Sequence, residues 1–395
     1  MNRTAAVAIL VAARLAFAQA SGGEDDASGA LQQKIDEVVE EAVDSNELLE
    51  AFTHLRFSGY VQARYLYSEA SGEGLNARGK PDVTDGFMVR RGRLKATYAL
   101  DWSEYVLNID ATGQGVTLKD GEVHLIEPWT GQRLELVVGQ TKYPFGFEVG
   151  QSSSVRELPE RSRVVRAFLA GDRDRGAKLL VDIGVLRAMV GVFDGNGIDD
   201  AGFVGVDNDQ NKDLIGRVGV DFGFISGGVS GWYGRTFRPD TVDSAGAVVT
   251  PGTTFDRTRL GMDLQLSGAV LSIGRTELRG EFIAGRTYQT NGVEQFGVPA
   301  IGWYAVVVQH LGDEDFLAVR YDYFDPLAGT KDTASADGTA PAPTNSVGTV
   351  GMVVGHEWNR SVKLSAAYEI VVTGTPQGIA DPDDNVLTLQ FQARF

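Results

Sequence analysis

The chain has 395 residues, no cysteine, 49 glycines and a formal net charge of −17. This acidic balance argues against a nucleic-acid partner, which would need a basic face. Beyond the N-terminus no apolar run approaches the ~18 residues of a membrane helix, which excludes an α-helical membrane protein but leaves a β-barrel open.

The first residues have the pattern of a secretory signal peptide. Arg3 lies in a short basic region, Ala5–Ala13 is apolar, and Ala16-Phe17-Ala18 forms an A-x-A cleavage site. We therefore expect residues 1–18 to be removed, with cleavage before Gln19. An ordinary N-terminal helix is the alternative.

Residues 19–54 are predicted to form a polar linker followed by a short periplasmic helix. Apolar and small residues recur with a 4-3 spacing over about three heptads, which is the seam of a coiled coil. Two interpretations stay open, a tether lying against the barrel and a self-associating helix. The seam residues are Leu31, Ile35, Val38, Ala42, Ser45, Leu49 and Phe52.

From Leu55 the hydrophobic period changes to two and stays so to the end of the chain, which predicts an all-β domain over 55–395. Sixteen strands are expected. They lie at about 55–67, 87–101, 104–112, 119–127, 133–142, 175–182, 185–194, 213–223, 228–237, 257–267, 270–284, 299–310, 316–324, 346–358, 361–373 and 386–395.

The connections between these strands alternate between short and long. An antiparallel meander with tight turns at one end and long loops at the other is typical of a transmembrane β-barrel of the bacterial outer membrane. An even number of strands places both ends of the barrel in the periplasm. The long connections fall near 68–86, 143–174, 195–212, 238–256, 285–298, 325–345 and 374–385, with a shorter one near 113–118.

The last strand supports this fold. Apolar side chains alternate with polar ones over 386–395, and the chain ends in Phe395. A terminal Phe after such a strand resembles the signal that many outer-membrane barrels present to their insertion machinery. A soluble barrel is the alternative, but its interior would have to bury many charged side chains, each at a large desolvation penalty. In a water-filled lumen the same side chains stay hydrated.

Strand parity predicts a basic pathway along the lumen. Arg91, Arg93 and Lys95 share one face of their strand and form a ladder about 6.6 Å apart. Arg64 and Arg133 are expected to join it. Such a ladder can pass an anion from site to site while its oxygens stay hydrogen-bonded.

Two further expectations concern the same strand and the lumen around it. Arg90 is assigned to the apolar side, where it would reach lipid headgroups. The lumen also contains acidic residues, so a transverse field without strong selectivity is the alternative to an anion pathway. These are Asp110, Glu135, Asp263, Glu277, Glu281 and Asp322.

The segment Gln140–Gly176 is the longest break in the strand pattern, and it is basic. Residues 151–178 carry seven basic side chains against four acidic ones. Long loops without their own strand are usually functional. We expect this loop to fold into the barrel and to narrow it. Its arginines are Arg156, Arg161, Arg163, Arg166, Arg173 and Arg175.

Over 55–395 the chain resembles the phosphate-selective porin O/P family. The resemblance lies in FSGYVQARY, FMVRRGRLKATY, VGQTKYPFGFE, SSSVRELPERSRVVRAF and GDRDRG, in this order. It implies a trimeric sixteen-stranded porin with a third loop in the channel, selective for anions such as phosphate in the founding members. Here the loop arginines are interleaved with Glu157 and Glu160, and the net charge is acidic.

No sequence pattern indicates a cofactor, a metal or an enzyme. The segment 194–200 (DGNGIDD) lacks the Glu expected at position twelve of a calcium loop, the four histidines are dispersed, and no G-x-S-x-G occurs. The predicted function is a passive, anion-selective outer-membrane channel, in contact with membrane lipid and lipopolysaccharide. A general or weakly cation-selective porin and a mainly structural or tethering barrel are the alternatives.

Overall fold

The computed structural model describes residues 53–70, 85–198, 207, 209–242, 248–290, 293–328, 346–359, 361–374 and 384–395. The expected signal peptide and nearly all of the 19–54 segment lie outside these residues. The chain divides into two compact units, one of residues 1–56 and 97–100 and one of residues 57–96 and 101–395. In the described part of the first unit, His54 Nδ1 lies 2.9 Å from the carbonyl oxygen of Ala99.

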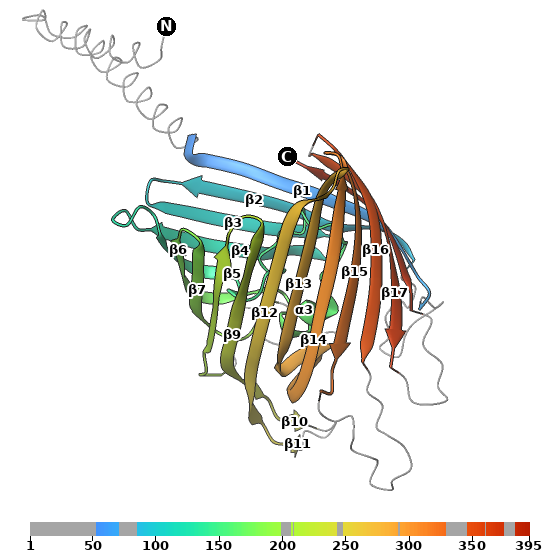
Figure 1. Ribbon diagram of the computed structural model, residues 1–395. Helices are drawn as coiled ribbons and strands as arrows, with labels where there is room; N and C mark the ends of the chain where they lie inside the picture. The colour runs from blue at the N-terminus through green and yellow to red at the C-terminus, as the bar shows by residue number, and fades with distance from the viewer. Residues whose placement is uncertain are drawn as a thin grey trace, which may run out of the picture. The chain divides into compact units, whose positions relative to one another are not determined.

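The second unit is a closed antiparallel barrel of sixteen strands, as predicted (Figure 1). Each strand pairs with its neighbours in the sequence, and β1 pairs with β18 to close the barrel, with Tyr60 opposite Arg394 and Ser68 opposite Val386. The strands are β1 (Leu55–Ser68), β2 (Gly86–Ala99), β3 (Ser103–Thr112), β4 (Gly115–Ile126), β5 (Leu134–Lys142), β6 (Arg173–Ile183), β7 (Leu186–Phe193), β8 (Asp213–Asp221), β9 (Ile225–Arg238), β12 (Thr253–Leu271), β13 (Gly274–Thr290), β14 (Val293–Leu311), β15 (Asp315–Asp325), β16 (Val347–Trp358), β17 (Val362–Thr373) and β18 (Val386–Arg394).

The wall of the barrel is apolar outside and polar inside. Along β12, Leu260 and Met262 are about half exposed on the outer face (53% and 50%), whereas Arg259 and Asp263 are buried on the inner face. The last strand has the same alternation, with Phe391 exposed and Gln392 buried. A soluble barrel would have the reverse distribution, so the observed pattern confirms the assignment of faces from parity.

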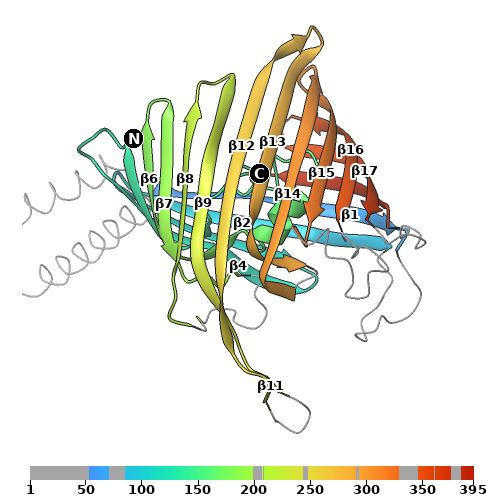
Figure 2. The same cartoon turned by 60° about the horizontal axis from the view of Figure 1, so that its bottom comes forward.

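Three strands are longer than the sequence pattern indicated. β12, β13 and β14 extend beyond the expected ends, so that the loop expected near 285–298 is almost entirely strand. The loop expected near 238–256 contains a small hairpin of β10 (Thr241–Val242) and β11 (Val248–Thr250), which continues β9 and β12 (Figures 1 and 2). These extensions contain β-branched and aromatic residues such as Thr254, Phe255 and Tyr288, which favour strands.

The connection between β3 and β4 also differs from the expectation. It is a two-residue turn, Gly113-Gln114, rather than a loop of six residues. Gly115 has a φ of +127°, which only glycine adopts without strain, so β4 begins directly after the turn. Strand pairing therefore starts at Gly115 and not near residue 119.

The barrel core lies between the wall and an inserted segment, Tyr143–Asp172, which we call the constriction loop. It contains the short helix α3 (Arg163–Phe168), which the sequence analysis did not predict. Buried loop side chains such as Phe145, Val164 and Phe168 form one hydrophobic cluster with Ile283 and Val308 of the wall. Among the described residues, no helix is long and apolar enough to cross a membrane.

Candidate functional site: the lumen and its constriction loop

The first limb of the constriction loop is fixed to the wall through backbone amides. The Gly146 amide donates to Ser230 Oγ (2.9 Å), and the Glu148 amide donates to Glu281 Oε2 (3.1 Å). Gly146 has a φ of +63°, and a Cβ at this position would lie 1.8 Å from Glu281 Oε1. The loop therefore requires glycine here to approach the wall.

The helix α3 packs its apolar face on β13, β14 and β15. The Phe168 ring contacts the rings of Tyr288 and Phe324, each with centroids 6.1 Å away. Val164 lies against Gly302, where a Cβ would come within 2.9 Å of the valine. Burial of each such side chain stabilises the docked loop by about 1.5–3 kcal/mol, so docking is mainly hydrophobic on this side of the lumen.

On the opposite side, Glu160 of the constriction loop binds three arginines of the wall. Its carboxylate lies 2.5 Å from Arg64 Nη2, 2.8 Å from Arg90 Nε and 3.0 Å from Arg91 Nη2. Burial raises the pKa of Glu160, but the adjacent guanidinium groups outweigh this and hold the pKa well below its usual range. We call these four residues the Glu160 clamp.

Membership of Arg90 in this clamp corrects its assignment to the lipid side. Arg90 lies near the end of β2, where its long side chain turns inward toward the loop carboxylate. Parity fixes the direction of the Cβ atom but not the end of a flexible side chain. The direction of the Arg90 guanidinium is decided by the charged partner within its reach, Glu160.

The other residues of the predicted pathway divide into three groups. Arg93 is paired with Asp110 at 3.1 Å, whereas Lys95 has no ion-pair or hydrogen-bond partner in the described part of the chain. Arg133 does not lie with them, because it is exposed in the turn before β5, where its backbone amide donates to Glu127 and its carbonyl oxygen accepts from the amide of Asp182. The structure thus brings Arg64, Arg91 and Arg93 together and separates Arg133.

Four of the six predicted loop arginines belong to the constriction loop itself. Arg161 holds the loop together, since it donates to the carbonyl oxygen of Glu148 (3.1 Å) and pairs with Asp172 (2.7 Å). Arg163 donates to Thr349 Oγ1 (3.0 Å), and Arg166 is exposed. Arg156 is buried, and its Nε and Nη1 have no hydrogen-bond partner.

The other two, Arg173 and Arg175, are strand residues of β6 and not part of the loop, which corrects the predicted bounds. Arg173 is buried between Asp120 (2.5 Å) and Asp172 (2.9 Å). Arg175 donates to the carbonyl oxygen of Asn196 (2.6 Å). Both therefore stabilise the junction between the wall and the loop.

A cavity of about 450 Å³ lies between the constriction loop and the wall formed by β1 to β6, and we call it the basic lumen cavity. Six lysine and arginine side chains line it against three acidic ones, a formal excess of three positive charges among these nine residues. The basic ones are Arg93, Lys95, Lys142, Arg173, Lys178 and Arg394, and the acidic ones are Asp120, Glu122 and Glu135.

Two cations of this cavity were not singled out from the sequence. Lys142 Nζ donates to the carbonyl oxygens of Gly150 (2.9 Å) and Gln151 (3.1 Å), and Lys178 Nζ donates to Thr141 Oγ1 (2.7 Å). Neither has a carboxylate within ion-pair distance among the described residues. Strand parity along β6 could have found Lys178, because it shares a face with the buried Asp174.

One other cavity of the lumen is acidic. A second cavity of about 220 Å³ is lined by residues of β13 to β18, at the end of the barrel with the short turns. Three basic side chains line it against five acidic ones, among them Glu157 and Glu357. The charges of the interior are therefore separated across the barrel.

Within the described residues no group of three or more His, Asp or Glu side chains is arranged to hold a metal ion. His124 instead bridges two carboxylates, Glu122 and Glu135. The segment 194–200 lies partly outside the described residues.

No protein-family model matches the sequence, and comparison with curated proteins finds no match. Solved structures do match. An anion-selective porin from Comamonas acidovorans is 14% identical with a TM-score of 0.58, and the match covers 86% of this chain and 99% of the porin. OprB of Pseudomonas putida is 12% identical with a TM-score of 0.57, covering 89% and 96%. The outer membrane channel DcaP of Acinetobacter baumannii is 11% identical with a TM-score of 0.54, covering 86% and 97%. At these identities the likeness concerns the fold, so the chain has the fold of outer-membrane porins.

Proposed function

We propose that the protein is a passive diffusion channel of the bacterial outer membrane and that it favours small anions. The apolar outer wall suits a lipid environment, and the charged interior suits a water-filled passage. The similar structures are porins and channels by their descriptions, and one of them is described as anion-selective. The constriction loop narrows the passage in this proposal.

The excess of positive charge in the basic lumen cavity carries the proposed anion preference. A unit charge about 8 Å from a permeating ion contributes about 0.5 kcal/mol in a water-like dielectric, before screening by salt. The three lysines of the cavity without a carboxylate partner among the described residues, Lys95, Lys142 and Lys178, would therefore change the partition of a monovalent ion by at most about tenfold. The acidic total of the chain matters less, because distant exposed charges are screened.

Within this proposal the basic residues have two roles. Arg64, Arg91 and Arg93 are paired with carboxylates, and they position the loop more than they attract ions. Lys95 and Lys178 are without a carboxylate partner among the described residues and line the cavity, so they act directly on anions. Phosphate, as the resemblance to the phosphate-selective porins suggests, is one such anion.

The assembly and targeting of the chain complete the proposal. We expect a homotrimer embedded in outer-membrane lipid and lipopolysaccharide, with removal of residues 1–18 and recognition of Phe395 by the barrel-insertion machinery. One similar structure, OmpT of Vibrio cholerae, is described in a trimer form. Deletion of residues 21–52 should leave a heat-modifiable trimer if the barrel wall alone directs assembly.

The reversal potential of the purified protein in a planar bilayer with a potassium chloride gradient tests the ion preference. The wild type should favour chloride. Replacement of Lys95, Lys142 and Lys178 together with Gln should lower the chloride-to-potassium permeability ratio by up to about tenfold. Lys212→Gln, in an outer connection, is the matched control and should leave the ratio unchanged. A wild-type channel that favours potassium would refute the anion preference but not the channel.

A general porin with weak selectivity is the second candidate, and the separation of charge across the lumen favours it. Basic groups on one side and acidic groups on the other create a transverse field, which orients polar solutes without choosing strongly between ions. A reversal potential near zero would support this candidate. A barrel without conductance would instead indicate a structural or tethering role.

A further inference from the structure

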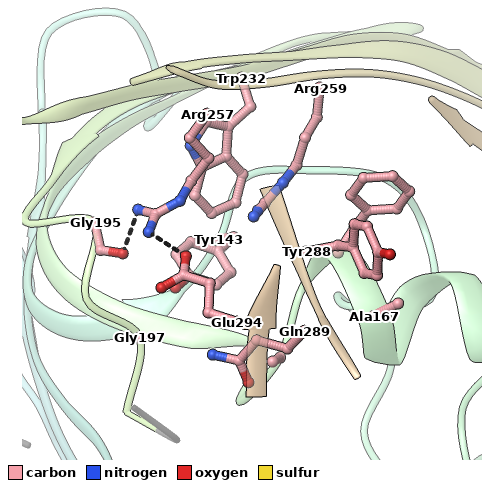
Figure 3. Close-up of a pocket in the computed structure, with 12 residues that line it drawn as sticks. Tyr143, Ala167, Gly195, Gly197, Trp232, Arg257, Arg259, Tyr288, Gln289 and Glu294 are labelled. Atoms are coloured by element: carbon pink, nitrogen blue, oxygen red, sulfur yellow. Dashed lines mark hydrogen bonds and ion pairs between the residues drawn. The ribbon is translucent and has the colours of Figure 1, made fainter. Parts of the chain in front are cut away.

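A third and smaller cavity lies on the other side of the constriction loop from the basic lumen cavity, near the end of the barrel with the long connections. Its volume is about 30 Å³. Arg257 and Arg259 of β12 enter it from one side, and Tyr288 and Gln289 of β13 line it from another (Figure 3). By the usual threshold of about 10–15 Å³ for one water molecule, it has room for two or three atoms of a ligand.

The two arginines of this cavity are in different electrostatic states. Arg257 is fully compensated, because it pairs with Asp213 (2.9 Å) and Glu294 (2.8 Å) and donates to the carbonyl oxygen of Gly195 (2.6 Å). Arg259 has no carboxylate partner among the described residues. Figure 3 shows both guanidinium groups pointing into the same space, with interactions drawn only to Arg257.

Arg259 is nevertheless buried, with 9% of its surface exposed. Its guanidinium lies 4.0 Å from the centroid of the Trp232 ring, and its Nη2 donates to the carbonyl oxygen of Thr287 at 3.2 Å. Among the described residues its Nε has no hydrogen-bond partner. Stacking on Trp232 fixes the plane of the guanidinium but does not neutralise its charge.

These features identify the kind of ligand that would complete the site. A guanidinium presents parallel N–H groups that match the two oxygens of a carboxylate. Trp232 covers only the face of the Arg259 guanidinium, and one donor on its edge, Nη2, is shared with the carbonyl oxygen of Thr287. A tetrahedral phosphate dianion would need more donors than the aromatic walls provide, and it would meet the carboxylate of Glu294. The small volume admits a carboxylate group and excludes a bulky ligand.

We propose that Arg259 binds the carboxylate group of small monocarboxylic acids in this cavity, at the outer end of the lumen. Gln289, which lines the same cavity, is an uncharged group able to donate a further hydrogen bond to such a ligand. The site would concentrate organic anions before they reach the basic lumen cavity, and in this respect the inference rests on the proposed channel function. Binding itself can be measured without any ionic current.

The test uses the full mature chain in detergent, titrated with acetate at constant chloride concentration. Isothermal titration calorimetry measures the affinity, and tryptophan fluorescence reports on Trp232. Acetate should bind the wild type saturably and at least tenfold more tightly than inorganic phosphate. Arg259→Gln should weaken acetate binding at least tenfold. Arg235→Gln is the control, because Arg235 is an exposed arginine of β9 that pairs with Asp256 and lies outside the cavity.

Arg259→Lys is the second variant, in case the glutamine variant does not give a heat-modifiable barrel. The lysine retains the positive charge but lacks the parallel N–H groups that can bind both oxygens of a carboxylate. Acetate affinity should therefore fall severalfold. Unchanged acetate affinity in the Arg259 variants, or phosphate binding as tight as acetate, would overturn the proposal. The conductance of the same preparations in planar bilayers is measured in parallel. It distinguishes a failure of the acetate-binding proposal from a failure of the proposed channel function.

Discussion

The Glu160 clamp provides the sharpest test of how the constriction loop is held. Glu160 is the one carboxylate that Arg64, Arg90 and Arg91 all contact in the described structure. Replacement with Gln keeps the size of the side chain but removes the charge. Three guanidinium groups of the wall then lose their shared counter-ion, which removes the attraction that holds the loop against β1 and β2.

The free-energy cost of Glu160→Gln can be worked out from the burial of the arginine partners. The side chains of Arg64 and Arg91 are 4% and 7% exposed, so these are buried pairs, whereas Arg90 is 38% exposed and contributes little. Removal of one partner of a buried ion pair typically costs about 3–5 kcal/mol. At 1.4 kcal/mol for each factor of ten, the undocked population of the loop should rise by a factor between about 10² and about 4 × 10³.

Single-channel recording in planar bilayers measures this change. Glu160→Gln should give a noisier current with additional conductance levels, together with a shift of the reversal potential toward anions. Glu157→Gln is the matched control, because Glu157 lies in the same loop but forms one ion pair, with Arg279 at 2.6 Å. Its effect should be clearly smaller. A quiet Glu160→Gln channel with wild-type selectivity would refute the idea that the clamp holds the loop.

Two further predictions concern the same loop. Burial raises the pKa of Asp172, but its two arginine partners outweigh this and hold the pKa at about 2. Since this lies below the value of about 3.9 for an unfolded Asp, the carboxylate contributes stability above pH 4, and about 2 kcal/mol is lost as the pH falls toward 2. The melting temperature of the barrel should fall in this window for the wild type but change less for Asp172→Asn. Gly261→Ala would place a Cβ 2.7 Å from the Phe145 ring and should destabilise loop packing by about 1–3 kcal/mol, whereas Gly231→Ala, with no atom within 4 Å, should have little effect in thermal melts.

The fold could be predicted because a β-barrel repeats one simple rule along its whole length. Side chains alternate between lipid and lumen, so the change of period at Leu55 and the sixteen amphipathic segments were visible without tertiary information. Strand ends were less predictable. Beyond the apolar band, β13 and β14 continue as a paired ribbon through Tyr288 and Gln295, and Tyr288 is buried against Phe168 of the constriction loop, a contact that the strand pattern does not indicate.

Some residues of the candidate site could be predicted from the sequence, but their ion-pair partners could not. Parity correctly placed Arg64, Arg91 and Arg93 on the inner face, yet it could not indicate that each would meet a carboxylate. The partner of Arg93, Asp110, comes from the adjacent strand. The partner of the other two is Glu160, about 70 to 100 residues away in the sequence. Such contacts depend on the path of the constriction loop through the lumen.

This dependence changes how a ladder of basic residues in a barrel should be interpreted. A buried arginine in a lumen has a large desolvation penalty, and a nearby loop carboxylate removes most of that penalty when the loop docks. The arginines that parity identifies most readily are therefore those most available to hold a loop. Lysines such as Lys95 and Lys178 line the cavity without a carboxylate partner among the described residues, and the Lys178 ammonium group is held by uncharged oxygens of Thr141 and Lys142. Ion selectivity in this lumen should accordingly follow the lysines, while the arginines determine how far the constriction loop can move.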